Sequence, residues 1–175
     1  FRQRPHAWVK LWKHHAAQKH ATEAVRVAKA RHESFLARYG DQITSEWLVP
    51  KVMEIIKDAP DVHEIARHYI EAGDFIVSRL TGTLARSACQ AGYKALWSAD
   101  DGYPSKDYYR ELDPGLEDLV ETRLQGEVRP VGSVAGQLTG PMADILGLKA
   151  GIPVSTAYID AHSAVPALGI TKPGT

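Results

Sequence analysis

Apolar positions in the N-terminal half of the chain recur at helical spacing, with polar residues between them. Residues 13–39 contain many Ala, Glu, Lys, Arg and His but no Gly or Pro, which predicts one long helix with Gly40 as its C-cap. The apolar side chains within 46–59 fall on one face of a second helix. A third helix is predicted from Pro60 to residue 70, and a fourth at 74–80, which Thr81-Gly82 should end. This half is therefore predicted to be helical.

The pattern changes after the fourth helix. Residues 83–104 combine small residues, three aromatic residues and a Gly-Tyr-Pro turn, which indicates a structured loop. Two short helices are predicted to follow, at 105–112 and 114–123.

Beyond Pro130 the pattern is typical of alternating strands and helices. Residues 131–138 and 154–159 are predicted strands, and Thr139-Gly140-Pro141 begins the helix between them. Asp160 comes directly after the second strand. The predicted fold class is therefore α/β.

Size and composition exclude several classes of protein. The 175 residues fit one domain, and no run of about 18 apolar residues could form a membrane-spanning helix. Cys89 is the only cysteine, so no internal disulfide can form, and a reducing, cytoplasmic location is expected. The chain begins at Phe1 and ends at Thr175, and neither end resembles a natural terminus. We therefore expect a piece of a longer protein.

Charge is unevenly distributed although 21 Lys and Arg balance 21 Asp and Glu. Residues 1–40 carry nine Lys and Arg against two Glu. A basic helix can bind nucleic acid, but it can also pack against an acidic remainder. The second interpretation is favoured because the cations alternate with Ala and His rather than with aromatic residues. No nucleic-acid partner is expected.

The histidines are not spaced as metal ligands. The pairs His15/His20 and His63/His68 are five residues apart, so their side chains point about 140° away from each other on a helix. No metal site is therefore predicted. Asp160, His162 and Ser163 include the residue types of a hydrolase triad but lie too close in sequence to form one.

Two charged residues have either a chemical or a structural interpretation. Asp160 at the end of a strand could face a ligand, because ligands bind at the carboxyl ends of strands in α/β folds, or it could cap the next helix. Lys94 is a lone cation among apolar residues. It could extend its amine to solvent, or donate to a sugar hydroxyl or phosphate.

Five blocks of the sequence resemble the FGGY carbohydrate kinase family, and several are typical of its ribulokinases. They are HAWVKLWKHHAAQ, ITSEWLVPKV, IEAGDFIVSRLTG, SACQAGYKALW and AYIDAHSAVPALG, and they cover nearly the whole chain. The resemblance implies a ribonuclease H-like (actin-like ATPase) domain of a sugar kinase, incomplete and with a large helical insertion. Residues 1–175 would form the middle and C-terminal part of the N-terminal, sugar-binding domain.

The resemblance also implies roles for individual residues. Asp160 matches the catalytic base of the family. Lys94 matches a residue that contacts the sugar, and Trp12 belongs to a segment that borders the sugar site. His162 is a further candidate for sugar binding. The nucleotide-binding residues would lie outside this chain.

The implied function is ATP-dependent phosphorylation of L-ribulose to L-ribulose 5-phosphate in L-arabinose catabolism. The resemblance implies ATP and Mg²⁺ held mainly by parts of the enzyme outside this chain, a small ketopentose as partner, and a homodimeric, cytoplasmic full-length enzyme. The segment alone is expected to be inactive. The alternatives are another FGGY kinase, of the xylulose or ribitol type, and a non-catalytic interaction module with the kinase fold.

Overall fold

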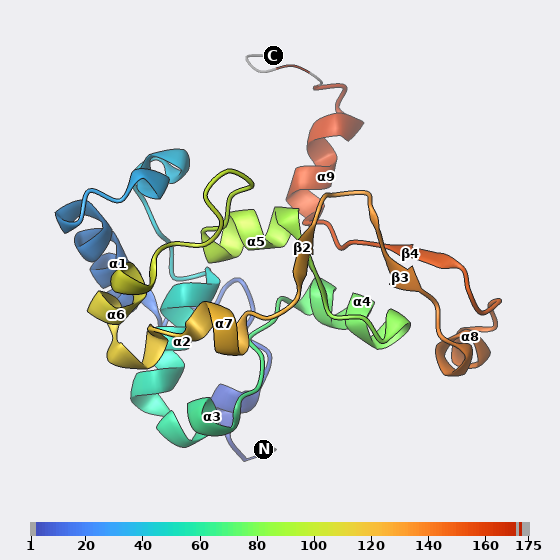
Figure 1. The fold of residues 1–175 in the computed structure, drawn as a ribbon, viewed down its shortest axis with the longest axis horizontal. Helices are drawn as coiled ribbons and strands as arrows, with labels where there is room; N and C mark the ends of the chain where they lie inside the picture. The colour runs from blue at the N-terminus through green and yellow to red at the C-terminus, as the bar shows by residue number, and fades with distance from the viewer. Residues whose placement is uncertain (1–2, 171, 173–175) are drawn as a thin grey trace. The chain divides into compact units, whose positions relative to one another are not determined.

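The computed structural model describes residues 3–170 and 172 and divides into two compact units (Figure 1). Unit 1 comprises Phe1–Ile70 and Gly92–Gln125, and unit 2 comprises Glu71–Ala91 and Gly126–Thr175. The helices of unit 1 are η1 (Pro5–Ala7), α1 (Gln18–Ala30), η2 (Ser34–Tyr39), α2 (Leu48–Asp58), α3 (Pro60–Ile65), α6 (Lys106–Leu112), η3 (Pro114–Leu116) and α7 (Leu119–Arg123). Unit 2 contains α4 (Ala72–Thr81), β1 (Ala85–Ser87), β2 (Glu127–Arg129), β3 (Val134–Gln137), α8 (Gly140–Leu146), β4 (Pro153–Ser155) and α9 (Asp160–Ala167). Helix α5 (Ala88–Ala95) spans the sequence boundary.

Unit 1 is built around apolar faces of its helices. Helix α1 contacts α2 and α6, and buried residues of all three elements share one core. Tyr108 of α6 lies in that core, where its ring meets Phe35 edge-on at 5.1 Å and its hydroxyl donates to the backbone oxygen of Ala24. The hydroxyl therefore keeps a partner although the ring is removed from water.

The predicted helix at 13–39 is wrong in its extent. Helix α1 ends at Ala30, and His32 adopts a left-handed conformation with φ of 55°. Amide groups of His32 and Glu33 donate to the carbonyls of Lys29 and Ala28, the pattern of a Schellman motif. The turn allows the following 3₁₀ helix to bury its apolar residues in the core. Gly40 ends η2 in the left-handed conformation, as predicted for a C-cap.

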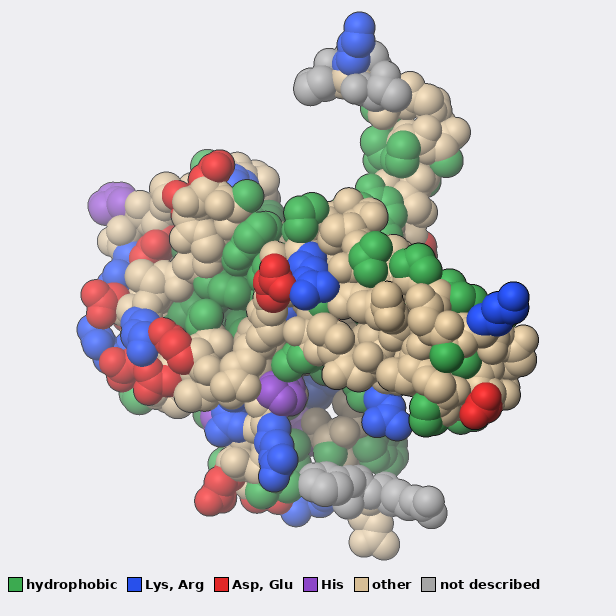
Figure 2. Space-filling view, turned by 45° about the vertical axis from the view of Figure 1, so that its right-hand side comes forward, with side chains coloured by type: hydrophobic (Ala, Val, Ile, Leu, Met, Phe, Trp, Pro, Cys, Tyr) green, Lys and Arg blue, Asp and Glu red, His purple; other side chains and the backbone are tan. Residues whose placement is uncertain are grey.

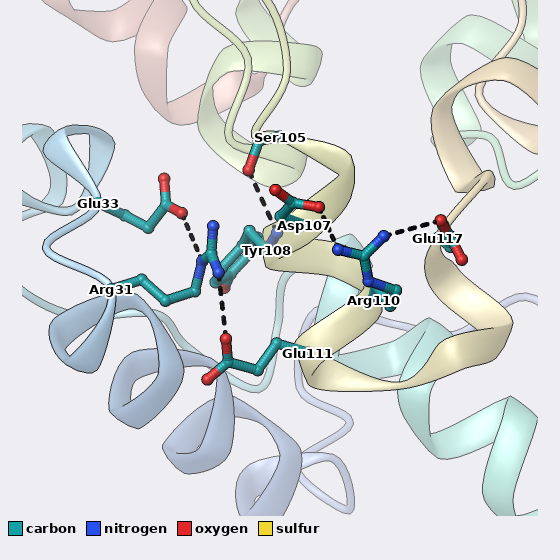
Figure 3. A network of polar contacts seen from close by, with 8 residues as sticks. All are labelled: Arg31, Glu33, Ser105, Asp107, Tyr108, Arg110, Glu111 and Glu117. Carbon is teal, nitrogen blue, oxygen red and sulfur yellow. Dashed lines mark hydrogen bonds and ion pairs between the residues drawn. The ribbon is translucent and has the colours of Figure 1, made fainter.

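Ion pairs stabilise the turn that the sequence pattern missed. In Figure 3 the guanidinium of Arg31 lies between the carboxylates of Glu33 and Glu111, at 2.9 and 3.1 Å. Arg110 contacts Asp107 one turn earlier on the same helix, α6, and Glu117 just after η3. Ser105 accepts a hydrogen bond from the Tyr108 amide and so caps α6, which lies within the predicted range.

The basic N-terminal segment pairs with acidic residues of the same unit. Arg4 contacts Asp61, and Arg38 Nη1 lies 2.9 Å from Asp101 Oδ2. Figure 2 shows cationic and anionic side chains intermixed on the face that it draws. This arrangement agrees with the interpretation that the basic segment packs against an acidic remainder.

Three other predictions for the helical half differ in outcome. Helix α2 lies within the predicted 46–59 range, with Pro50 in its first turn, and its predicted apolar face is buried or half-buried. Helix α3 ends at Ile65, so the prediction of a helix to residue 70 is wrong. The amide of Tyr69 instead donates to the carbonyl of Arg123, a partner far along the chain. Gly82 ends α4 as predicted.

The predicted loop at 83–104 is also wrong in part, because it contains β1 and α5. Strand β1 pairs in parallel with β2, with Ala85 opposite Glu127. These strands are separated by about 40 residues of sequence, so the pairing is not visible in any local pattern. The segment between them contains α5, α6, η3 and α7.

Unit 2 packs one helix against two small sheets. Helix α4 contacts β1, β3 and β4, and Val77, Ala85 and Ala135 form the buried core between them. Strands β3 and β4 pair antiparallel with an irregular register between Val134 and Gly136, and run side by side in Figure 1. Gly136 lies so close to α4 that a Cβ there would be 2.8 Å from the Cβ of Thr81. The predicted α/β class is confirmed.

Candidate functional site

Asp160 is the first residue of α9 and is exposed to solvent. Strand β4 ends at Ser155, so four residues without regular structure separate the strand from Asp160, and the prediction that it directly follows a strand is wrong. Its Oδ1 accepts a hydrogen bond from the Ala161 amide at 2.8 Å. The N-cap position itself belongs to Ile159. Asp160 thus satisfies one first-turn amide while its carboxylate stays accessible to water.

The neighbours of Asp160 on α9 do not form a relay with it. Ser163 Oγ donates to the backbone oxygen of Asp160 at 2.6 Å, a bond within the helix. His162 is half-buried, with Nδ1 3.1 Å from Cys89 Sγ and its ring edge-on to Tyr158. The hydrolase interpretation that the sequence disfavoured has no support in this geometry.

Lys94 lies in the last turn of α5 and is half-buried. Its Nζ is 5.2 Å from the ring centroid of Tyr93, a cation–π distance, and that ring tilts against Trp47. Among residues 3–170 and 172, no carboxylate forms an ion pair with Lys94. The amine is therefore held beside an aromatic surface while retaining its capacity to donate to a ligand.

Trp12 occupies a turn before α1 and is 67% exposed. The residues around it contact the middle of α2 and the segment just before that helix. Lys10 Nζ lies 3.1 Å from Glu54 Oε2, and His14 Nε2 lies 3.0 Å from each oxygen of the same carboxylate. His15 Nδ1 is 3.1 Å from Ser45 Oγ.

Glu54 is a buried carboxylate that the sequence analysis missed. Burial opposes its ionisation, but hydrogen bonds from His14 and Lys10, together with their charges, outweigh that effect and place its pKa below the usual value. It also lines a cavity of about 520 Å³ with Trp8, Lys10 and His14. The available signal was a lone acidic residue inside the apolar run VMEII.

Asp74 is a second buried carboxylate that the sequence did not single out. It is 2% exposed, and its Oδ1 accepts hydrogen bonds from the Ser87 amide at 3.0 Å and from Gln90 Nε2 at 3.2 Å. Burial raises its pKa to about 6, although the Ser87 hydrogen bond and the charge of Arg86 act in the opposite direction. Asp74 thus joins α4 to the first turn of α5.

The four predicted site residues fall into two groups. Asp160 and His162 share the first turn of α9 in unit 2, whereas Trp12 and Lys94 belong to unit 1. Within the described part of unit 1, no hydrogen bond or ring contact joins Trp12 to Lys94.

Neither a metal-binding cluster nor a membrane-spanning helix is found in the part of the chain that the structure describes. In the described residues, no three His, Cys, Asp or Glu side chains are grouped so that they could hold a metal ion. None of the helices in the described part of the chain is both long and apolar enough to cross a membrane.

Sequence comparison finds bacterial relatives over almost the whole chain. It is 48% identical over 174 residues to a ribulokinase of Geobacillus thermodenitrificans and 52% identical over 171 residues to one of Shouchella clausii. These alignments cover 99% and 98% of this chain but 31% and 30% of the relatives. The chain therefore spans about a third of the length of the curated relatives it matches. No protein-family model matches it.

Solved sugar kinases share the fold. A xylulose kinase from Brucella ovis aligns with a TM-score of 0.71 at 18% identity, covering 94% of this chain and 32% of that one. A xylulose kinase from Rhodospirillum rubrum aligns with a TM-score of 0.68 at 25% identity, covering 88% and 31%. The fold is thus that of one part of a sugar kinase, as the resemblance implied.

Proposed function

From its membership of the ribulokinases, of which it forms one segment, we propose that this chain belongs to an enzyme that phosphorylates L-ribulose with ATP. The product is L-ribulose 5-phosphate, as in the breakdown of L-arabinose. We assign residues 1–175 to the middle and C-terminal part of the sugar-binding domain. The full-length enzyme is expected to act in the cytoplasm as a homodimer.

The observation that carries the proposal is the exposed carboxylate of Asp160 at the start of α9. Phosphoryl transfer requires an alcohol aligned with the γ-phosphorus of ATP and a group that accepts its proton. Oδ1 is engaged by the Ala161 amide, so Oδ2 is the oxygen assigned to the proton. The hydrogen bond fixes the carboxylate plane without neutralising its charge.

The proposed step is a direct transfer. The 5-hydroxyl of the sugar gives its proton to Asp160 while its oxygen forms a bond to the γ-phosphorus. The bond between that phosphorus and the β,γ-bridging oxygen breaks, and ADP leaves. A base held by a helix terminus is positioned well enough to act at the moment of transfer.

Lys94 and Trp12 are proposed to hold the sugar. The amine of Lys94 would donate a charge-assisted hydrogen bond to a sugar oxygen, with Tyr93 beside it to limit its rotation. Trp12 presents an exposed aromatic face that can pack against the carbon face of a sugar. His162 is proposed as a further sugar contact because it belongs to the same family motif, YIDAH, as Asp160.

The described residues form no cluster that could hold a metal ion by itself. Magnesium would neutralise charge on the phosphates of ATP, but the described residues contain no group of side chains that could hold it. We assign Mg²⁺ and most of the ATP site, as the family resemblance implies, to parts of the enzyme outside this chain. The proposed phosphoryl transfer uses no metal ligand from these residues.

A xylulose kinase is the second candidate, because the structural neighbours include two kinases of that specificity. A coupled assay of the full-length enzyme with L-ribulose, xylulose, ribitol and glycerol separates the two. We expect the highest kcat/KM with L-ribulose. A tenfold preference for another sugar would reject the substrate assignment, and no turnover of any sugar would favour a non-catalytic module.

A further inference from the structure

Trp12 projects from a segment in which most neighbouring residues are tethered. In addition to the bonds of Lys10, His14 and His15, Lys51 Nζ of α2 donates to the backbone oxygen of Leu11 at 3.0 Å. Trp12 and Lys13 are both exposed. The Trp12 ring therefore lies outside the core, on a turn whose other residues are held in place.

Glu54 is the centre of these anchors. Lys10 precedes Trp12 by two residues and His14 follows it by two, and both bind the one carboxylate of Glu54. The two ends of the turn are thereby held at a common point on α2. Because this carboxylate is only 3% exposed, water cannot readily replace either partner.

We infer that Glu54 is a positioning residue for sugar binding. It holds the turn Lys10–His14, and so fixes the orientation of Trp12 before the ketose binds. The inference rests on the function proposed above. Glu54 itself is buried, so it does not touch the sugar. Its effect comes from pre-ordering Trp12, because a side chain fixed before binding loses less conformational freedom when the ligand arrives.

The direct test is Glu54→Gln in the full-length enzyme. The amide keeps the shape of the side chain but loses the charge that binds Lys10 and His14. We expect the KM for L-ribulose to rise about tenfold, with kcat and the KM for ATP within about twofold of the wild type. Glu33→Gln, which disturbs a different ion-paired carboxylate of the same unit, is the matched control and should leave the sugar KM unchanged.

A double-mutant cycle with Trp12→Ala separates positioning from general damage. If Glu54 acts through Trp12, Glu54→Gln should change the sugar KM by less than twofold once Trp12 is absent. An equal rise in both backgrounds would overturn the inference while leaving the kinase assignment intact. Should Glu54→Gln fail to fold, His14→Gln takes its place in the double-mutant cycle with Trp12→Ala. This variant weakens the contact between residue 14 and Glu54 at a side chain that is only partly buried.

A readout without substrate distinguishes this inference from the proposed function. Hydrogen exchange of the peptide that spans residues 10–15 should become at least fivefold faster in Glu54→Gln, and unchanged in Glu33→Gln. Unaltered exchange would reject the tether. Faster exchange in an enzyme that phosphorylates no pentulose would retain the tether but reject both the proposed function and its role in sugar binding.

Discussion

The carboxylate of Asp160 accepts a hydrogen bond from its own helix and is also exposed to solvent. An Asn substitution separates the two roles, because it keeps the hydrogen-bond acceptor and removes the group that can be protonated. In Asp160→Asn the amide oxygen can still accept from Ala161, but the side chain cannot take a proton. We expect kcat to fall by about 10²–10⁴-fold, the usual contribution of a general base. The measurement is steady-state kinetics on the full-length enzyme.

Thermal unfolding of the same variant provides the control. If Asp160 only stabilised α9, the variant would keep most of its kcat and lose up to about 1 kcal/mol of stability. Retention of more than a third of the wild-type kcat would therefore return Asp160 to a structural role.

Replacement of Lys94 should weaken binding of the sugar but not binding of ATP. A lost charge-assisted hydrogen bond is worth about 1.5–3 kcal/mol, so Lys94→Ala should raise the sugar KM roughly 10- to 150-fold. The KM for ATP is expected to stay near the wild-type value. Lys106→Ala, which removes an exposed, ion-paired lysine of the same unit, is the matched control. A weakened ATP KM with an unchanged sugar KM would contradict the assignment.

At the scale of elements, the junction between α4 and α5 depends on a carboxylate whose ionisation is costly. The pKa of Asp74 lies near 6 in the folded chain, against 3.8 for the free group. The folded state therefore holds more protons than the unfolded state between about pH 4 and 6, and the free energy of unfolding falls as pH rises through that window. Above pH 6 the full penalty is present.

Asp74→Asn should remove this dependence on pH. The amide oxygen can still accept from Ser87 and Gln90, whereas no charge has to be buried. The variant should gain stability relative to the wild type from pH 4 to 6, by up to about 3 kcal/mol. Denaturant unfolding at several pH values measures the difference, with the exposed Asp144→Asn of α8 as control. Parallel pH profiles for the wild type and Asp74→Asn would refute the prediction.

The elements that the sequence predicted well are those set by local pattern. The apolar face of α2 and the glycines that end η2 and α4 depend on neighbours within about four residues. The break at His32 was missed because its Schellman motif uses a histidine where glycine is usual. Strand β1 was missed because it needs β2 as partner.

At the scale of the whole molecule, the chain spans about a third of the length of its curated relatives. This affects how the 175 residues should behave when they are purified alone. Unit 2 exposes apolar side chains on β3 and around α8, among them Val134, Ile145 and Leu148. Exposed apolar surface and short open sheets favour association between chains. We expect the isolated 175 residues to self-associate and to show no kinase activity.

Light scattering and calorimetry with Mg-ATP on one preparation test this expectation. A monomer that binds ATP at micromolar concentration would place the nucleotide site within these residues, contrary to the assignment above. Sugar-dependent ATP hydrolysis by the isolated segment would do the same.

The sequence by itself determined the helical faces, several helix ends and, through the family resemblance, the candidate residues Asp160, Lys94, Trp12 and His162. These depend on local spacing or on motifs that can be compared directly between proteins. Only the tertiary structure decided that Glu54 holds both sides of the turn that carries Trp12, and that Asp74 joins α4 to α5. Glu54 and His14 are 40 residues apart. The burial and ionisation of such a carboxylate are set by partners that only folding brings to it, and no local pattern encodes them.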